Sequence, residues 1–202
     1  MIDPGAPVIS ARGLERSFGR KRVLRGLDLA VPEGGFLLVT GPNGSGKSTL
    51  LALAAGLLAP TRGTIEVAPD RRERGFLAHE PLVYRELTAF ENLELYGRLY
   101  RVPERRERIG MLLERFGLWD ARRERVGNFS RGMQQRLAFC RVLLHEPRLV
   151  LLDEPYSSLD EGAGELVDSE LRALAAAGRT LVVSTHDPVR LAPLATARLA
   201  LA

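Results

Sequence analysis

The fold of this 202-residue chain is decided by the stretch Gly41-Pro42-Asn43-Gly44-Ser45-Gly46-Lys47-Ser48-Thr49. It matches the phosphate-binding loop pattern of Gly, four residues, then Gly-Lys-Ser/Thr. It follows an apolar run, Phe36–Thr40, that predicts a buried strand, and it leads into a helical run, Lys47–Leu58. Its glycine spacing does not fit the G-x-G-x-x-G pattern of dinucleotide-binding proteins. Because strand, loop and helix coincide, we predict an α/β nucleotide-binding fold rather than a glycine turn that only connects two elements.

Each part of this loop has a chemical reason to bind phosphate. Glycines let backbone N–H groups converge on phosphate oxygens, and the helix that begins near Lys47 directs its positive end to the same place. Lys47 supplies a mobile cation for the β- and γ-phosphates, and Ser48 supplies a hydroxyl ligand for Mg²⁺. The sequence therefore predicts that Gly41 to Thr49 bind a nucleoside triphosphate together with Mg²⁺.

Two carboxylates, Asp153 and Glu154, follow the apolar run Leu149–Leu152, which predicts a central strand of a parallel sheet. A carboxylate at a strand end can hold Mg²⁺, usually through water, opposite Ser48. The next carboxylate can polarise the attacking water. Without the phosphate-binding loop, an acidic pair facing solvent would be the better explanation. With the loop present, we predict that Asp153 serves the metal and Glu154 the chemistry.

In their order along the chain, these motifs resemble those of the ATP-binding-cassette (ABC) ATPases. Leu149–Glu154 resembles the family's Walker B strand with its catalytic glutamate, and Ser157-Ser158-Leu159-Asp160 resembles the D-loop. Ser184-Thr185-His186-Asp187 is similar to the His switch, which implies that His186 contacts the γ-phosphate and the attacking water. Phe18, in Ser17-Phe18-Gly19, matches the aromatic residue that stacks on adenine. The resemblance implies an ATP hydrolase with Lys47, Glu154 and His186 as catalytic residues, although a lone histidine or phenylalanine is more often structural.

A further segment, Phe129-Ser130-Arg131-Gly132-Met133-Gln134-Gln135-Arg136, resembles the family's signature, which contacts a nucleotide held by a different subunit. The usual Leu-Ser-Gly-Gly-Gln is altered, because Arg131 replaces the first glycine and Met133 the glutamine. The resemblance implies a homodimer, or a pair with a related subunit, in which one subunit contacts the other's ATP through Ser130, Arg131, Gly132 and Asp160. Taken alone, Ser130 also predicts a helix N-cap, and one helix end can serve both purposes.

The family's Q-loop is also altered. In Phe76-Leu77-Ala78-His79-Glu80-Pro81, His79 stands where the family has the glutamine that contacts Mg²⁺, and either His79 or Glu80 could substitute for it. The surrounding segment is similar to the ATP-binding subunit of the haem exporter of cytochrome c maturation. That resemblance implies an integral membrane permease as partner, which we expect to contact Leu82–Ala89.

Strand and helix patterns predict a single ABC ATPase domain over residues 1–202. We expect a core at about 1–87 and 146–202, with a mainly parallel sheet and an N-terminal β subdomain, and a helical subdomain at about 88–145. In the helical part, apolar residues recur at helical spacing, and Pro103 and Gly117 separate the helices. Elsewhere Ala59–Gly63 ends the first helix, Thr64–Val67 predicts a strand, a helix is expected over 164–177, and strands are expected at 180–184 and about 197–201.

The composition is that of an ordinary soluble domain, with 45% hydrophobic and 27% charged residues. The net charge is +4, but arginines alternate with glutamates, so we expect a solvated mixed surface and no nucleic acid partner. The single cysteine, Cys140, excludes an internal disulfide. The start, Met1-Ile2-Asp3-Pro4-Gly5, lacks a signal-peptide pattern. The longest charge-free apolar stretch, Ser48–Thr61, is 14 residues, short of the ~20 that span a bilayer.

These observations predict the ATPase subunit of a bacterial exporter, peripheral at the cytoplasmic face of the cell membrane. Haem is the expected cargo, and a drug, lipid or polysaccharide is the alternative. A soluble ABC ATPase acting on ribosomes or DNA is a second class, disfavoured because such relatives generally carry two cassettes or long coiled coils. A nucleotide-binding regulator without turnover is disfavoured because Lys47, Ser48, Asp153, Glu154 and His186 are all present.

Overall fold

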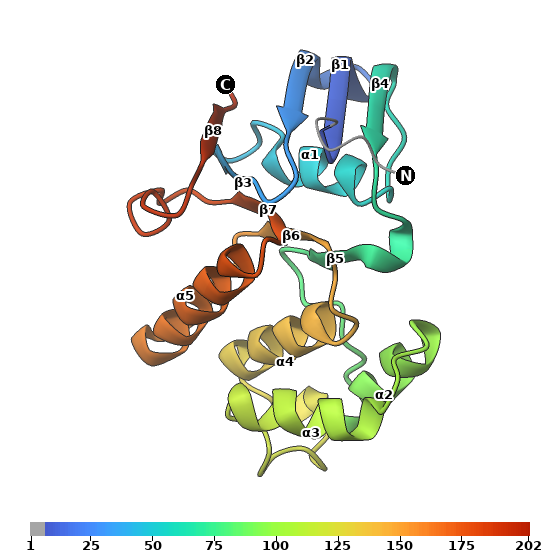
Figure 1. Ribbon diagram of the computed structural model, residues 1–202, viewed down its shortest axis with the longest axis vertical. Helices are drawn as coiled ribbons and strands as arrows, with labels where there is room; N and C mark the ends of the chain where they lie inside the picture. The colour runs from blue at the N-terminus through green and yellow to red at the C-terminus, as the bar shows by residue number, and fades with distance from the viewer. Residues whose placement is uncertain (1–6) are drawn as a thin grey trace.

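A parallel sheet of five strands lies at the centre of the computed structural model, which describes residues 7–202 (Figure 1). Its strand order is β5-β6-β7-β3-β8, and every neighbouring pair is parallel. The strands are β3 (Phe36–Thr40), β5 (Arg74–Leu77), β6 (Leu149–Asp153), β7 (Thr180–Ser184) and β8 (Ala197–Ala200). The predicted α/β fold with a mainly parallel core is confirmed.

The central strands are apolar throughout because both faces of this sheet are covered. Successive side chains of a strand point to opposite faces, and β3 divides accordingly. Leu38 packs with Phe36 in a core beneath the helices, whereas Leu37 and Val39 pack in a second core. Leu149 and Leu151 of β6 belong to that second core, while their neighbours in β6 belong to the first. Continuous apolar runs are therefore required here, as in other buried parallel sheets.

The second core is closed by α1 (Lys47–Ala54) and by an antiparallel sheet of three strands at the top of Figure 1. This sheet has the order β2-β1-β4, with β1 (Ile9–Phe18), β2 (Lys21–Val31) and β4 (Arg62–Val67). Its long hairpin pairs Phe18 with Lys21 at the turn. The hairpin tip therefore carries both of these side chains.

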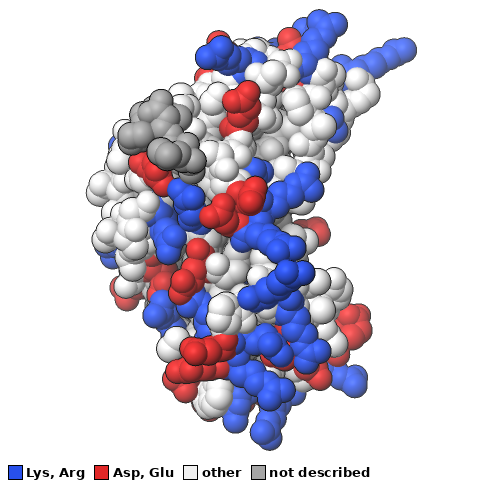
Figure 2. All heavy atoms as spheres, turned by 45° about the vertical axis from the view of Figure 1, so that its right-hand side comes forward, with Lys and Arg blue, Asp and Glu red and all other residues white. Residues whose placement is uncertain are grey.

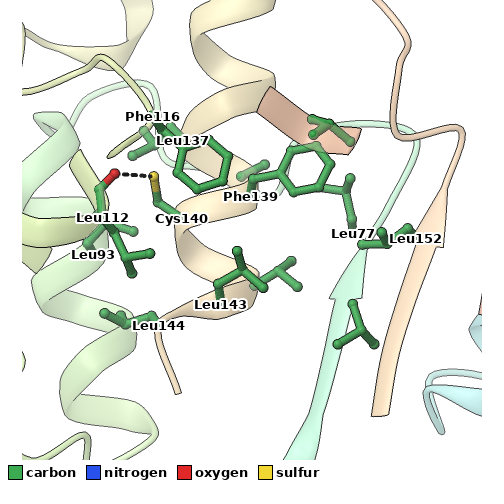
Figure 3. Packing of buried hydrophobic residues seen from close by; sticks show 14 of the residues in the cluster. Leu77, Leu93, Leu112, Phe116, Leu137, Phe139, Cys140, Leu143, Leu144 and Leu152 are labelled. Carbon is green, nitrogen blue, oxygen red and sulfur yellow. Dashed lines mark hydrogen bonds between the residues drawn. The ribbon is translucent and has the colours of Figure 1, made fainter. Parts of the chain in front are cut away.

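The first core lies between the central sheet and four helices: α2 (Ala89–Leu99), α3 (Arg105–Arg115), α4 (Arg131–Leu143) and α5 (Glu161–Ala176). Two short 3₁₀ turns, Arg71–Glu73 and Val126–Asn128, connect elements. Figure 3 shows Cys140 of α4 inside this core, with its Sγ atom 3.6 Å from the carbonyl oxygen of Leu112. Burial raises the pKa of the Cys140 thiol, so the side chain acts as a small apolar group. The division into core and helical subdomain stays a prediction.

Several boundaries differ from those predicted. The first helix ends at Ala54 rather than Leu58, because Gly56 adopts a left-handed backbone with φ of 76° and ends the helical path. Strand β4 begins at Arg62, inside the predicted helix stop. Helix α5 begins at Glu161, three residues earlier than expected, because the Asp160 carboxylate accepts the backbone N–H of Ala163 at 2.8 Å and caps it.

The surface carries charge of both signs. On the face drawn in Figure 2, basic side chains gather in a band and acidic side chains lie beside them. Within residues 7–202, no helix combines the length and apolar character that crossing a bilayer requires. The segment used to predict the absence of a signal peptide, residues 1–5, lies outside the described residues.

Candidate active site

Three parallel strands end side by side at one edge of the central sheet. β6, β7 and β3 are consecutive neighbours, so the segments that follow them meet there. These segments are the phosphate-binding loop after β3, Glu154 after β6 and His186 after β7. They surround a cavity of about 660 Å³. The cavity is lined by Lys21, Val23, Asn43, Gly44, Gly46, Lys47, Ser48, Thr49, His79, Glu154, Ser157 and His186.

The phosphate-binding loop has a backbone that only glycine accommodates at its two ends. Gly41 has φ of 146°, and a Cβ atom there would lie 2.4 Å from the carbonyl oxygen of Leu201. Gly46 has φ of 106° and caps α1 without any side-chain hydrogen bond. The first backbone N–H groups of α1 have no partner within the helix, and the Oγ atom of Ser45 is buried without a partner. The loop therefore offers several donors that fit the oxygens of a phosphate chain.

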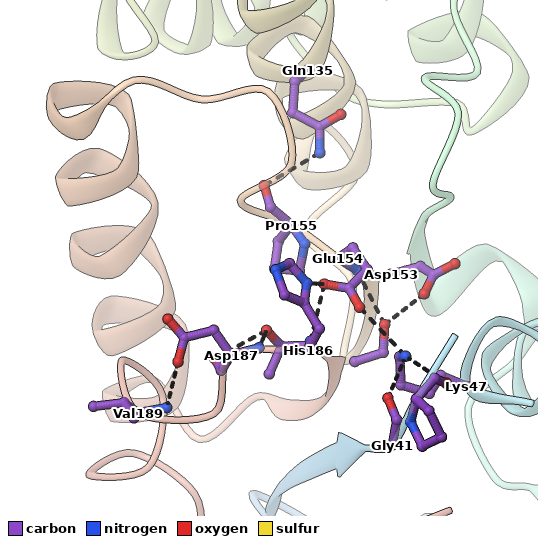
Figure 4. A network of polar contacts seen from close by, with 12 residues as sticks. Gly41, Lys47, Gln135, Asp153, Glu154, Pro155, His186, Asp187 and Val189 are labelled. Atoms are coloured by element: carbon purple, nitrogen blue, oxygen red, sulfur yellow. Dashed lines mark hydrogen bonds and ion pairs between the residues drawn. The ribbon is translucent and has the colours of Figure 1, made fainter. Parts of the chain in front are cut away.

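The Lys47 ammonium group lies inside this loop. Its side chain is only 6% exposed, and its Nζ atom donates to the carbonyl oxygens of Gly41 at 2.8 Å and Pro42 at 3.3 Å. The same atom lies 3.6 Å from an oxygen of Glu154 (Figure 4). The positive charge of Lys47 is thus compensated by the Glu154 carboxylate, which directly follows β6.

Glu154 links the lysine to the histidine. One carboxylate oxygen faces Lys47, and the other accepts the backbone N–H of His186 at 3.2 Å and lies 2.8 Å from its Nδ1 atom. The backbone of Glu154 is left-handed, with φ of 49°, which costs on the order of 1–3 kcal/mol. Its N–H donates to the backbone oxygen and hydroxyl of Ser184, which holds this strained turn in place. Strain retained between three functional groups is typical of an active site.

Asp153 is placed behind the cavity rather than on its wall. Its carboxylate is 2% exposed and accepts the Ser184 hydroxyl at 2.5 Å. Ser48, at the first turn of α1, lies on the wall. A hydroxyl on the wall and a recessed carboxylate are hard oxygen donors that fit Mg²⁺, with water between the metal and Asp153. Both candidates for the altered Q-loop are exposed to cavities: His79 lines the 660 Å³ cavity, and both His79 and Glu80 line a neighbouring one of about 520 Å³.

Other predicted site residues lie away from this cavity. Phe18 is 47% exposed at the hairpin tip, and the guanidinium of Arg16 covers one face of its ring at 4.5 Å. Ser130 caps α4 by accepting the backbone N–H of Met133 at 3.2 Å. Among the described residues, the lining of the 660 Å³ cavity does not include the predicted in-trans contacts Ser130, Arg131, Gly132 and Asp160.

Arg131 and Gly132 lie instead against the segment that follows Glu154. Arg131 lines the 520 Å³ cavity together with Ser157 and Ser158. A Cβ atom on Gly132 would lie 3.1 Å from the carbonyl oxygen of Ser158, so the signature segment and the D-loop are packed closely. The role of these residues toward a nucleotide of another subunit stays a prediction.

Sequence reasoning missed Lys21 and Val23, which line the 660 Å³ cavity from β2. A signal was available for the first of them. The chain has only two lysines among its 29 basic residues, and both of them, Lys21 and Lys47, line the same cavity. No local pattern shows that the hairpin folds over the phosphate-binding loop, so the contact depends on the tertiary structure.

The geometry agrees with the comparison to protein families. The family model described as "ABC transporter" matches residues 24–157, which include the phosphate-binding loop, the signature segment and Glu154. This protein belongs to the ABC transporter family. The match includes the phosphate-binding loop and Glu154 of the cavity wall and ends before His186, so the chain contains the ATPase domain of that family.

The similar proteins include one named as an exporter and one named as an importer. The chain is 39% identical over 209 residues to a macrolide export ATP-binding/permease protein of Paracoccus denitrificans, covering 93% of this chain and 31% of that protein. It is 40% identical over 215 residues to a phosphonates import ATP-binding protein of Anaeromyxobacter dehalogenans, covering 95% of this chain and 42% of that protein. The chain thus spans less than half the length of either relative.

A solved structure of an ATP-binding cassette is similar over most of its length. It is a dimer in a post-hydrolysis state with bound ADP and Pi. It shares 30% sequence identity with this chain, with a TM-score of 0.86 over 96% of this chain and 94% of that chain. This likeness confirms that the parallel core, the hairpin sheet and the helices together form an ABC ATPase fold.

Proposed function

We propose that this protein binds ATP with Mg²⁺, hydrolyses it, and drives export through a membrane permease formed by other chains. The observation that carries the proposal is the meeting of Lys47, Glu154 and His186. These residues come from three different strand ends, yet Glu154 lies 3.6 Å from Lys47 and 2.8 Å from His186. A cation, a carboxylate and an imidazole on one cavity beside a helix N-terminus match the needs of phosphoryl transfer to water.

Each residue has one task in this proposal. The backbone N–H groups of the loop and Lys47 hold the β- and γ-phosphates, so that the terminal phosphate lies near Glu154. Glu154 then orients and polarises the attacking water, and His186 contacts the γ-phosphate and that water. Mg²⁺, held by Ser48 and through water by Asp153, would neutralise charge that develops on the phosphate oxygens.

Substitution of Glu154 by Gln tests the catalytic assignment. The amide keeps the size of the side chain but cannot accept a proton, so we expect hydrolysis to fall by about a hundredfold or more while ATP still binds. The change should be measured as phosphate release, with ATP affinity determined in parallel. A matched control is Glu161→Gln, which changes an exposed carboxylate on the first turn of α5. Undiminished hydrolysis in Glu154→Gln would overturn the assignment.

The proposal includes a homodimer, or a pair with a related subunit, in which two ATP molecules lie between subunits. Support comes from the similar cassette, which is a dimer, and from the exposed position of Ser130 and Arg131 at the start of α4. In such a dimer Ser130, Arg131, Gly132 and Asp160 would complete the partner's site. Glu154→Gln should then accumulate an ATP-dependent dimer, measurable by light scattering after size exclusion.

Leu82–Ala89 is the proposed contact with the permease. Leu82 and Tyr84 are 46% and 51% exposed, which is unusual for such apolar side chains. The loop backbone is nevertheless fixed, because the buried Asn92 exchanges hydrogen bonds with the backbone of Tyr84 at 2.7 and 2.9 Å. The Tyr96 hydroxyl also donates to the carbonyl oxygen of Leu82. A rigid loop with outward apolar side chains suits a partner interface.

For the cargo, we propose haem, on the resemblance of His79–Pro81, Glu86–Ala89 and Glu91–Leu93 to the haem exporter subunit. Drug export is the second candidate, favoured by the similarity to the macrolide exporter. Lipid or polysaccharide export remains a further alternative. The protein would then be peripheral at the cytoplasmic face of the cell membrane.

Purification of this protein with its permease from detergent-solubilised native membranes separates the candidates. A haem-handling permease supports the haem proposal, and a multidrug-type permease overturns it. Binding to ribosomes or DNA that falls steeply with salt, without any permease, would favour the soluble class instead. The basic band of Figure 2 makes that control necessary.

A further inference from the structure

The two segments that carry Glu154 and His186 leave neighbouring strands, and both continue beyond the cavity as loops. β6 and β7 pair through Asp153 and Ser184, after which the chain enters the loops 154–160 and 185–196. Effective catalysis requires the reacting groups to be held within roughly 0.5 Å of their productive positions. Contacts outside the cavity that join the two loops would help to hold Glu154 and His186 in place.

Asp168 on α5 connects both loops. Its Oδ1 atom accepts the Tyr156 hydroxyl at 2.6 Å, and Tyr156 follows Glu154 by two residues. The Nε atom of Arg190, four residues after His186, lies 2.9 Å from both carboxylate oxygens of Asp168. One carboxylate thus receives a side chain from each catalytic loop.

Tyr156 and Arg190 also contact each other. The guanidinium carbon of Arg190 lies 4.8 Å from the centre of the Tyr156 ring, within the range of a cation–π interaction. The three side chains therefore form a closed triangle rather than two separate hydrogen bonds. A closed arrangement restricts both loops more than either bond alone, because movement of one loop disturbs two contacts.

Helix α5 leaves space for the Arg190 guanidinium at Gly164. Gly164 lies one turn before Asp168, and a Cβ atom there would come within 2.9 to 3.2 Å of the Arg190 guanidinium. The guanidinium thus lies against the bare backbone of α5. Gly164 is buried and lies inside the regular helix α5, so its lack of a side chain serves packing rather than a turn.

The charges of the cluster favour the same contacts. Burial acts to raise the pKa of Asp168, but the hydrogen bonds and charge of Arg190 and the Tyr156 hydroxyl outweigh it and lower that pKa. The hydrogen bond with Asp168 in turn raises the pKa of Arg190. The carboxylate is thus ionised at neutral pH, and its side chain is only 14% exposed, which strengthens both hydrogen bonds.

We propose that Tyr156, Asp168 and Arg190 are positioning residues, which hold the loop of Glu154 and the loop of His186 in register for ATP hydrolysis. None of the three lines the 660 Å³ cavity, so they act through Glu154 and His186 rather than on the nucleotide. The inference rests on the proposed catalytic roles of those two residues.

Asp168→Ala tests this inference, with Glu170→Ala as a matched control. Both carboxylates lie on α5, and the side chains of Asp168 and Glu170 are 14% and 11% exposed. Each pairs with an arginine from another segment. The partner of Glu170 is Arg115 on α3, which is not part of either catalytic loop. We expect Asp168→Ala to lower the single-turnover hydrolysis rate at saturating ATP by about tenfold to a hundredfold. The Kd for ATP should stay within roughly twofold of the wild-type value, since the cavity walls are unchanged.

Glu170→Ala should keep a near wild-type rate even if its melting temperature falls as far as that of Asp168→Ala. Asp168→Asn, which retains the acceptor oxygen, should restore most of the rate. Equal rate losses in the two alanine variants would show that Asp168 only stabilises the fold and would overturn the inference.

Tyr156→Phe is a second test in case Asp168→Ala does not fold, because it removes only the hydroxyl that donates to Asp168. A rate and Kd unchanged from wild type in Tyr156→Phe would also overturn the inference. Glu154→Gln separates this result from the proposed function. If Glu154→Gln retains hydrolysis, the catalytic assignment itself is wrong. If Glu154→Gln is inactive while both network variants are fully active, only the positioning role is lost.

Discussion

At the scale of single residues, the candidate site is built from side chains whose positions are strongly constrained. Lys47 is almost completely buried between carbonyl oxygens and Glu154. Glu154 is held in a left-handed conformation by Ser184. These contacts show why conservative changes at such positions should have large effects on chemistry and small effects on folding.

Lys21 is predicted to contact the bound nucleotide. It lines the cavity from the hairpin tip, opposite the phosphate-binding loop, where a positive charge attracts a polyanion. Lys21→Met should weaken ATP binding roughly fivefold, and the loss should shrink at high salt because the charge is exposed. Titration calorimetry at two ionic strengths measures both effects. Arg22→Met is the control, since Arg22 follows Lys21 in the sequence but does not line the cavity. Equal losses in the two variants would contradict a specific contact.

At the scale of elements, helix ends serve two purposes. α2 begins with a complete capping box, in which Thr88 and Glu91 each accept the other's backbone N–H. α4 begins with Ser130 alone, so the cap and the predicted in-trans phosphate contact use one hydroxyl. A substitution that keeps the cap but repels phosphate can separate the two roles.

Ser130→Asp makes that separation. Aspartate caps a helix as well as serine and suits the positive helix end, so stability should stay within about 0.5 kcal/mol of wild type. A carboxylate facing the partner's γ-phosphate should nevertheless prevent the ATP-dependent dimer and cooperative hydrolysis. Thermal melting, ATP affinity at low protein concentration and phosphate release test the three expectations. The in-trans role is wrong if hydrolysis persists, and the picture of separate half-sites is wrong if monomeric ATP binding disappears.

At the scale of the whole molecule, two cores on opposite faces of one sheet hold the structure together, and a few buried polar groups lie at their margins. One is His145, just after α4. Its ring stacks on Tyr100 with centroids 3.9 Å apart, and its Nε2 atom lies 3.1 Å from the carbonyl oxygen of Arg74. Its Nδ1 atom is buried without a partner. This histidine therefore joins the helices to the edge strand β5.

His145 should make the fold sensitive to acid. Burial lowers its pKa from 6.5 to about 4, and the nearby charges of Arg141 and Arg108 act in the same direction. The unfolded chain binds this proton more readily, so its contribution to stability is complete above pH 6.5. The free energy of unfolding should therefore fall by about 3 kcal/mol between pH 6.5 and pH 4 on account of this residue.

His145→Phe keeps an aromatic ring on Tyr100 and removes the titration. Urea unfolding of both proteins between pH 4 and pH 7 should give a shallower pH dependence for the variant. Tyr100→Phe is the control and should keep the wild-type dependence, because it retains both the stacked ring and His145. Parallel curves for His145→Phe and wild type would contradict the assignment.

The sequence by itself determined the local structures and the family. The glycine spacing of the phosphate-binding loop, the apolar runs of β3, β6 and β7, and the cap at Ser130 are local patterns, since backbone conformation and burial act over a few neighbouring residues. They predicted the parallel core and located Lys47 and Glu154, whereas His186 was identified by the resemblance of Ser184–Asp187 to the His switch of ABC ATPases. They were less accurate at element ends, such as the stop of α1 at Ala54, where a left-handed glycine overrides helical periodicity.

Only the tertiary structure decided which side chains meet. Strand order and register bring Glu154 between Lys47 and His186, place Lys21 of the hairpin on the same cavity, and join Tyr156 to Arg190 through Asp168. The side chains that contact each other directly lie between 12 residues (Tyr156 and Asp168) and 107 residues (Lys47 and Glu154) apart in the sequence. No local propensity encodes such contacts, because they arise from the packing of the sheet, its helices and the hairpin as one body.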